Sequence, residues 1–189
     1  LGCSPHEVLV CSTGLIGFPL PMDRIIPAIP TVAAALADDG GLAAARAIMT
    51  TDTVPRTTAL TGTTLDGGTF TIGGVAKGAA MLEPNMATML AVLTTDALLD
   101  ATTATDLLRS AVGVSFNCLT VDGAESTNDT VLLLASGTAG PVATDEIGAA
   151  LSDACRDLAV QMADDAEGST KTVFLTVTGA ATDTEAAKG

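Results

Sequence analysis

The sequence predicts an α/β protein, a layered sandwich of helices and mostly antiparallel sheets. Two β-rich runs, Arg56–Leu65 and Thr69–Val75, flank the turn Asp66-Gly-Gly68, which is the pattern of an antiparallel hairpin. Helices are expected between the β-rich runs, and layers of helix packed on sheet are the natural class for such a chain. The longest helix is predicted to begin at a capping Thr144, with one apolar face formed by Ile147, Leu151, Ala154, Leu158 and Met162.

Length and composition favour a single domain, residues 1–189, with its own core. Apolar residues make up 48% of the chain but aromatic residues only 2%, so the core is expected to consist of aliphatic and methionine side chains. The chain begins with Leu1 rather than Met, and it stops just as Thr182 looks like the cap of another helix. We therefore expect a fragment of a longer protein.

The first quarter of the chain contains a predicted strand and a glycine-rich turn. Glu7–Cys11 predicts a buried strand, and Ser12–Gly17 follows it with two glycines. A turn at a strand end can aim its amide groups at a developing oxyanion, although a plain glycine turn explains the same pattern. Helical segments are expected from Pro19, with breaks or kinks at Pro27 and Pro30, and then at 33–36 and 42–49.

The second half continues with strands and helices. The linker 122–129 is rich in turn formers and carboxylates, but its spacing fits no EF-hand, so a hydrogen-bonded turn is the better interpretation than a metal loop. The expected elements are strands at Thr88–Thr95, Thr170–Thr178, and Ser115–Val121 paired with Thr130–Ser136, with a helix over 102–115.

Polar groups that follow these elements have two interpretations each. Thr50–Thr53 is either the turn after a helix or a cluster of hydroxyls that meets a polar ligand. Lys77, one of three lysines, is either a solvated loop charge or a partner for a substrate carboxylate. Glu167 follows the long helix, and from the residues alone it is best interpreted as a surface carboxylate.

Charge and rare residues exclude several functions. The chain has 8 basic and 22 acidic residues, a net charge of −14, which argues against nucleic-acid binding because counterion release needs Lys and Arg. No apolar run approaches the roughly 20 residues that span a bilayer, so we expect a soluble, cytoplasmic protein that binds no membrane. The acidity fits either an ordinary cytosolic surface or a salt-adapted, halophilic one.

Histidine and cysteine chemistry is limited. His6 is the single histidine, and the cysteines stand far apart with no Cys-x-x-Cys pair, so we expect no zinc or other metal site. A Ser-His-Asp or Cys-His arrangement is disfavoured for the same reason, and any nucleophile must find another base. We expect reduced thiols in or near the core at Cys3, Cys11, Cys118 and Cys155.

The stretch 77–90 suggests such a nucleophile. Thr88 lies after a Pro-Asn turn, at the head of an apolar run, where a strand end presents a side chain. Ala87 before it is small, so its carbonyl is open to attack. We hypothesise that the chain cleaves itself between Ala87 and Thr88 into pieces 1–87 and 88–189. Thr88 would then carry a free α-amine with a pKa of about 7.7–8.0, close to working pH, and serve as its own base.

The sequence resembles the ornithine acetyltransferase family (bifunctional glutamate N-acetyltransferase/amino-acid acetyltransferase) of arginine biosynthesis. The matching motifs occur in family order across nearly the whole chain. They are Cys11-Ser-Thr-Gly-Leu-Ile-Gly17, Pro21-Met-Asp23, Ala47-Ile-Met-Thr-Thr-Asp-Thr53, Ala76-Lys-Gly78, Met81-Leu-Glu-Pro-Asn-Met-Ala-Thr-Met-Leu90, Thr94-Thr-Asp-Ala97, Ser126-Thr-Asn-Asp-Thr130 and Glu167-Gly-Ser-Thr-Lys171.

The resemblance implies a fold, a reaction and a set of site residues. The fold would be the aminopeptidase-like N-terminal-nucleophile fold, and Thr88 would be the nucleophile, freed by self-cleavage after Ala87. Thr13 and Gly14 would form the oxyanion hole. The substrate amino acid would contact Thr50, Lys77, Thr88 and Glu167. One departure from the family pattern is Ala80, where the family has glycine.

The implied reaction moves acetyl from N-acetylornithine to glutamate through an acetyl-threonine. No metal or organic cofactor is implied, although acetyl-CoA serves as a donor substrate in bifunctional members. The cleavage products would assemble as an α/β hetero-oligomer. Two alternatives remain open: an N-terminal-nucleophile amidase or peptidase, which releases the acyl group to water, and an inactive folded fragment.

Overall fold

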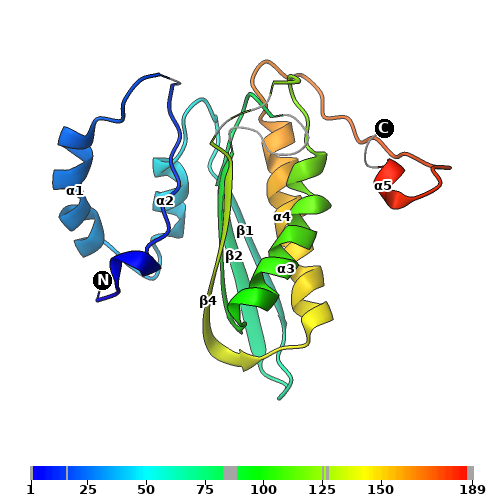
Figure 1. The fold of residues 1–189 in the computed structure, drawn as a ribbon, viewed down its shortest axis with the longest axis horizontal. Helices are drawn as coiled ribbons and strands as arrows, with labels where there is room; N and C mark the ends of the chain where they lie inside the picture. Colours follow the sequence, from blue (N-terminus) through cyan, green and yellow to red (C-terminus); the bar gives the residue numbers. More distant parts are fainter. Residues whose placement is uncertain (1, 16, 83–88, 125, 127, 187–189) are drawn as a thin grey trace.

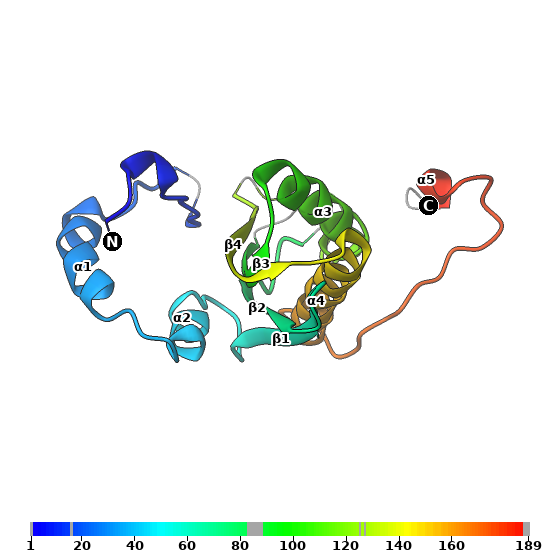
Figure 2. The same ribbon diagram turned by 90° about the horizontal axis from the view of Figure 1, so that it is seen from below.

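The computed structural model describes residues 2–15, 17–82, 89–124, 126 and 128–186. Its centre is a four-stranded sheet in the order β1-β2-β3-β4, and helices α3 and α4 lie side by side across one face of it (Figures 1 and 2). The elements are η1 (Pro5–Glu7), α1 (Met22–Ala34), α2 (Gly41–Ala47), β1 (Arg56–Thr63), β2 (Thr69–Lys77), β3 (Leu90–Leu98), α3 (Ala101–Gly113), η2 (Phe116–Cys118), β4 (Thr130–Pro141), α4 (Thr144–Asp164) and α5 (Asp183–Ala186). The predicted α/β class is confirmed.

The expected hairpin forms β1 and β2. The two strands are antiparallel, with Arg56 opposite Ala76 and Thr63 opposite Thr69. The turn between them needs a left-handed residue, and Gly67 supplies it at φ 87°. The carboxylate of Asp66 accepts hydrogen bonds inside this turn, including one from the Gly68 amide at 3.3 Å.

Strand β4 pairs with β3 in parallel, which the sequence did not indicate. Leu90 lies opposite Thr130, so the two strands begin at the same edge of the sheet. Parallel neighbours need a long crossover connection, and α3 provides it. The expected strand Ser115–Val121 is wrong, because Phe116–Cys118 forms the 3₁₀ turn η2 after that helix. Phe116 is only 3% exposed and packs into the core instead.

Helix α4 covers the sheet with the face that its spacing predicts. Ile147, Leu151, Ala154, Leu158 and Met162 are all buried, at 0 or 1% exposure, in one cluster with the inner side chains of β2 and β3. The cluster also contains two of the few aromatic side chains, so the expectation of an aliphatic and methionine core is only partly confirmed. Those two are Phe70 and Phe116.

The expected cap of α4 is wrong in one detail. Thr144 is the first residue of the helix, and Ala143 occupies the cap position without a side-chain hydrogen bond. Glu146 lies in the first turn, where a carboxylate is favoured by the helix dipole. Its side chain accepts a hydrogen bond from the Thr63 amide at 2.6 Å, so the start of α4 is joined to the end of β1.

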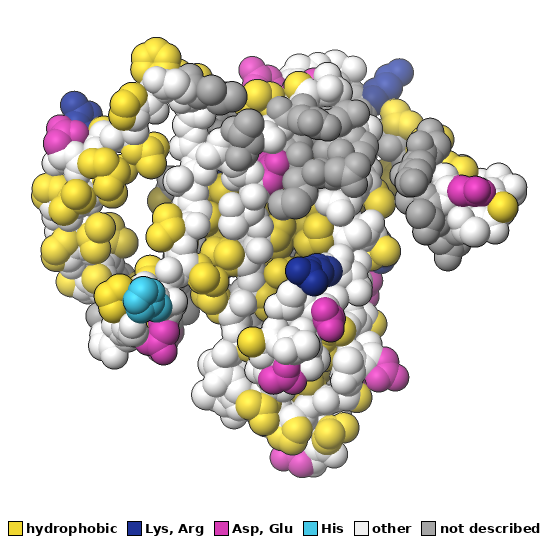
Figure 3. Space-filling model, viewed as in Figure 1, with side chains coloured by type: hydrophobic (Ala, Val, Ile, Leu, Met, Phe, Trp, Pro, Cys, Tyr) yellow, Lys and Arg dark blue, Asp and Glu magenta, His cyan; other side chains and the backbone are white. Residues whose placement is uncertain are grey.

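The N-terminal residues form an arm beside the sheet (Figure 1). The expected buried strand Glu7–Cys11 is wrong: η1 ends at Glu7, and the next residues are exposed, with Val10 at 80%. A buried strand needs a hydrogen-bonded neighbour and a packing surface, and the described sheet offers it neither. Figure 3 shows hydrophobic side chains gathered over the arm, and in α1 the exposed ones are Met22, Ile25, Ile26, Ile29 and Val32.

Pro27 and Pro30 lie inside α1 without breaking it. Each proline removes one donor from the helix, but the surrounding residues are exposed and water can bond the carbonyls left over. Of the residues expected to form a separate segment at 33–36, Ala33 and Ala34 are the last two of this helix and Ala35 is its C-cap. The segment expected at 42–49 is α2, and the helix expected at 102–115 is α3, capped by the Asp100 carboxylate.

The C-terminal strand expected at Thr170–Thr178 is also wrong. These residues carry no strand pairing among the described residues, and Val173 and Leu175 are both 81% exposed. The expected helix start after them is confirmed, because the Thr182 hydroxyl accepts a hydrogen bond from the Glu185 amide at 3.1 Å.

In the described ranges, none of the helices has the length and apolarity needed to cross a membrane.

The contrast between buried and exposed leucines gives a test of this fold. Leu158→Ala should lower the free energy of unfolding by about 2–5 kcal/mol, because it leaves a cavity between α4 and β2. Leu175→Ala, on the exposed C-terminal segment, should change it by less than about 0.5 kcal/mol. Urea unfolding measures both, and equal losses would show that the 170–178 segment is packed.

Candidate active site

One end of the sheet gathers the residues that the sequence singles out. Strand β2 ends at Lys77, β3 begins at Leu90, and β4 begins at Thr130, and the register places these three positions side by side. Ala87 and Thr88, the expected cleavage site and nucleophile, lie outside the described residues. Met89, which follows them, is described and is 2% exposed at the start of β3.

Lys77 is buried rather than solvated. It is 1% exposed, so the interpretation as a solvated loop charge is wrong. Burial lowers the pKa of Lys77, while the charges of Asp52 and Asp129 oppose that shift. Among the described residues no carboxylate lies within ion-pair distance of its ammonium group. A buried cation of this kind is suited to an anionic ligand group.

Asp52 joins the segment at Thr50 to the residue that follows Lys77. Its carboxylate accepts the Thr50 amide at 2.9 Å and the Gly78 amide at 2.8 Å. Thr50 follows α2, and Gly78 follows Lys77 directly. Burial would raise the pKa of Asp52, but these amides and the Arg56 guanidinium together hold the pKa below its ordinary value. The carboxylate is therefore ionised in the folded protein.

Glu167, which follows α4 near the end of the sequence, lies at the same end of the sheet. Its amide donates to the Ala79 carbonyl at 2.7 Å, two residues beyond Lys77. Its side chain is exposed, as expected for a surface carboxylate. The structure thus brings together the main-chain segments that carry Thr50, Lys77 and Glu167, which come from three distant parts of the sequence.

Arg56 is a site residue that the sequence reasoning missed. Its side chain is fully buried, and the guanidinium is hydrogen-bonded to the Asp52 carboxylate, to Asp165 at 2.7 Å and to the Gln161 carbonyl at 3.2 Å. The Thr53 amide and hydroxyl also donate to Asp165. The one signal in the sequence was an arginine at the start of a β-rich run, in a chain with few basic residues.

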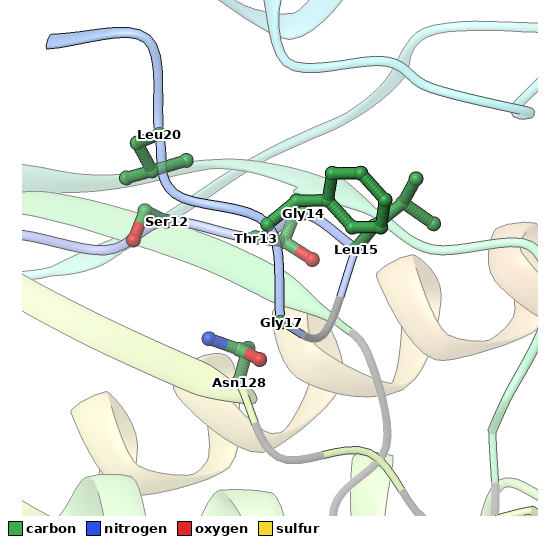
Figure 4. A pocket seen from close by; sticks show the side chains of 8 residues that line it. Ser12, Thr13, Gly14, Leu15, Gly17, Leu20 and Asn128 are labelled. Carbon is green, nitrogen blue, oxygen red and sulfur yellow. The ribbon is translucent and has the colours of Figure 1, made fainter.

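Thr13 and Gly14 line a cavity of about 260 Å³ between the N-terminal arm and the loop before β4 (Figure 4). In Figure 4 the side chain of Asn128 faces the loop that carries Thr13. The expected oxyanion residues therefore lie near the loop that leads into β4. The cavity is lined by Ser12, Thr13, Gly14, Leu15, Gly17, Phe18, Leu20 and Asn128.

Asp129 connects this loop to the start of β3. Its carboxylate accepts the Met89 amide at 2.8 Å, and burial raises the pKa of Asp129 above its ordinary value. Met89 directly follows Thr88 in the sequence, so the loop that carries Asn128 is fixed to the residue next to the expected nucleophile. Neither Asn128 nor Asp129 was predicted from the sequence as a site residue.

Among the described residues, no group of three or more His, Cys, Asp or Glu side chains could hold a metal ion. The described residues provide a buried cation at Lys77, with the Glu167 segment bonded two residues beyond it, and a hydroxyl at Thr13 beside Asn128. A buried ammonium group of this kind is chemically suited to a carboxylate.

Burial of Lys77 predicts a cost in stability. Because the pKa of Lys77 is lower in the folded protein, the unfolded chain binds more protons here. The charge of Lys77 therefore destabilises the fold below the folded pKa, and this cost disappears as pH rises from that pKa toward 10.5. We expect Lys77→Met to raise the free energy of unfolding at pH 7, as measured by urea unfolding. Lys171→Met, at an exposed position, should leave it unchanged. A less stable Lys77→Met protein would show that the charge is favourably paired.

Known proteins resemble this chain over nearly its whole length. A family model described as the ArgJ family matches residues 1–189. The chain is 51% identical over 183 residues to "Arginine biosynthesis bifunctional protein ArgJ" of Mycolicibacterium paratuberculosis, covering 95% of this chain and 44% of that protein. It is 48% identical to the protein of the same name from Thermobifida fusca, covering 98% and 48%. The chain spans about half the length of the curated relatives it matches.

Solved structures show only a low likeness. A protein from Pyrococcus horikoshii matches with a TM-score of 0.41 and 10% identity, covering 58% of this chain and 39% of that one. The L-aminopeptidase D-Ala-esterase/amidase of Ochrobactrum anthropi matches with a TM-score of 0.39 and 16% identity, covering 60% and 41%. Scores at this level carry no conclusion about the fold.

Proposed function

The chain belongs to the ArgJ family, and from this membership we propose that it is part of an acetyltransferase of arginine biosynthesis. The proposed reaction moves acetyl from N2-acetylornithine to glutamate through an acetyl ester on Thr88. The observation that supports it most is the convergence of Thr50, Lys77 and Glu167 at the sheet end where the strand after Thr88 begins.

Self-cleavage would prepare the nucleophile. The Thr88 hydroxyl oxygen attacks the Ala87 carbonyl carbon, the peptide C–N bond breaks, and an ester forms with a free amine on Thr88. Water then hydrolyses that ester and releases the carboxylate of Ala87. The new α-amine has a pKa of about 7.7–8.0 and can accept the hydroxyl proton in each later cycle. This route needs no histidine.

Acetyl transfer would follow as two half-reactions. The Thr88 oxygen attacks the acetyl carbonyl of acetylornithine while the α-amine accepts the hydroxyl proton. The tetrahedral intermediate then collapses, its C–N bond breaks, and the proton passes to the departing ornithine. Glutamate brings its amine to the acetyl-threonine ester in the second half, and acetylglutamate leaves with the Thr88 hydroxyl restored. The kinetics should be ping-pong.

Thr13 and Gly14 would hold the negative oxygen of each tetrahedral intermediate. A hydroxyl and a backbone amide are suitable donors, and a preorganised donor is worth about 10²–10³ in kcat. Both residues line the cavity beside Asn128, near the loop that is fixed to Met89. Their place supports the role that the family resemblance implies.

Lys77 would bind the α-carboxylate of the substrate amino acid. Its burial makes the attraction to an anion stronger than it would be in water. Thr50 and Glu167 would contact the same amino acid. Because glutamate and acetylornithine both carry an α-carboxylate, one recognition site serves both half-reactions.

The two cleavage products would remain associated as an α/β hetero-oligomer. Strand β2 belongs to piece 1–87 and β3 to piece 88–189, and they pair over 72–77 and 90–95. Cleavage at residue 87 leaves that ladder intact. We also propose a cytoplasmic enzyme without a metal or organic cofactor, in which acetyl-CoA serves as an alternative donor substrate.

Thr88→Ala tests both the cleavage and the transfer. The full-length protein should appear in intact mass spectrometry as two pieces that meet at Ala87/Thr88, whereas the variant should stay whole and transfer no acetyl group. Thr61→Ala, an exposed threonine on β1, serves as the matched control and should cleave normally. A variant that still cuts at this bond would rule out self-cleavage by Thr88. Acetate released without acetylglutamate would identify an amidase instead.

Thr13→Val tests the oxyanion role. Removal of the hydroxyl should lower kcat about 10²–10³-fold with little change in KM, because the donor acts only when charge develops on the acetyl oxygen. Ser12→Ala, from the same cavity, should have a much smaller effect. A change in KM alone, measured by the rate of acetylglutamate formation, would contradict the assignment.

A further inference from the structure

We propose that Arg56 is the positioning residue of the amino-acid recognition site, and that it acts by fixing the segments that carry Thr50, Lys77 and Glu167. This inference rests on the proposed function, because those three residues are assigned to substrate there. Arg56 itself contacts no substrate; its role is carried by the two carboxylates that flank its guanidinium, Asp52 and Asp165.

The guanidinium is fully enclosed and makes three separate polar contacts. One terminal nitrogen bonds to Asp52, the other lies 2.7 Å from Asp165, and Nε donates to the Gln161 carbonyl at 3.2 Å. Arg56 and the Asp52 side chain are 0% exposed, and the Asp165 side chain is 11% exposed. An arginine can serve these three acceptors at once because its donors form a rigid planar fork.

Asp52 connects Arg56 to the segments near Lys77. The same carboxylate that binds Arg56 also accepts the Thr50 amide and the Gly78 amide. Gly78 has φ 146°, a value that L side chains rarely adopt, and it directly follows Lys77. The carboxylate therefore sets the positions of two chain segments that enter the site from α2 and from β2.

Asp165 connects Arg56 to the segment that carries Glu167. It follows the last residue of α4, and it accepts the Thr53 amide at 2.9 Å. Two residues further, the Glu167 amide donates to the Ala79 carbonyl. Arg56 thus joins the end of α4 to the loop between α2 and β1. Without the guanidinium, two buried or nearly buried carboxylates would be left together, and their segments would separate.

Arg56→Lys is the main test variant, in the full-length acetyltransferase. Lysine keeps the charge but has a single head group and cannot serve both carboxylates and the carbonyl. Asp165→Asn is the second variant, at the less buried end of the network. Arg156→Lys is the matched control, because Arg156 pairs only with Asp153 on the surface, where the two side chains are 56% and 64% exposed.

The readout is discrimination between two acetyl donors. N-acetylputrescine has the amide and the amine of acetylornithine but lacks its α-carboxylate. If Arg56 positions the carboxylate-binding site, Arg56→Lys should raise KM for acetylornithine about tenfold, with kcat changed less than about threefold. The rate with N-acetylputrescine should fall much less, because this donor has no carboxylate for Lys77 to bind, so discrimination between the donors falls several-fold. Asp165→Asn should shift it in the same direction.

Other outcomes decide against the inference. Equal losses with both donors would make Arg56 a general structural residue, as would failure of both variants to fold. Unchanged discrimination in both folded variants would also overturn it. The wild-type protein is assayed first. If it transfers no acetyl group from acetylornithine, the proposed function itself is refuted.

Discussion

The buried guanidinium of Arg56 is the constraint on which this end of the molecule depends. A charge removed from water is costly unless it is paired and hydrogen-bonded, and the structure meets that condition with two carboxylates and a carbonyl. The acceptors come from the loop before β1 and from the end of α4. Their convergence on one side chain is why three distant segments meet where β2 ends.

The parallel pairing of β3 and β4 is the second constraint. It makes both strands begin at the edge where β2 ends, so the first residues of β3 and β4 lie at the same edge as Lys77. Asp129 then joins one loop to the other through the Met89 amide. A fully antiparallel sheet would have sent the start of β4 to the opposite edge, away from the strand that follows Thr88.

The elements with a strong periodic pattern or a clear turn signal could be predicted from the sequence. The conformation of the exposed segments could not. The apolar face of α4 and the hairpin around Gly67 follow from local spacing and turn chemistry, which tertiary contacts reinforce. Glu7–Cys11 and Thr170–Thr178 have strand-like composition, but β-structure depends on a neighbour, and the described sheet gives them none. The resemblance supplied Thr13, Gly14, Thr50, Lys77 and Glu167, and the structure groups the last three.

By itself the sequence determined the family, the α/β class, the main helix and the candidate nucleophile, because these follow from motifs and from spacing along the chain. Only the tertiary structure decided that Lys77 is buried, that β4 runs parallel to β3, and that Arg56 joins Asp52 to Asp165. Burial and ion pairing are properties of surroundings assembled from segments more than a hundred residues apart. No local pattern of residues encodes them.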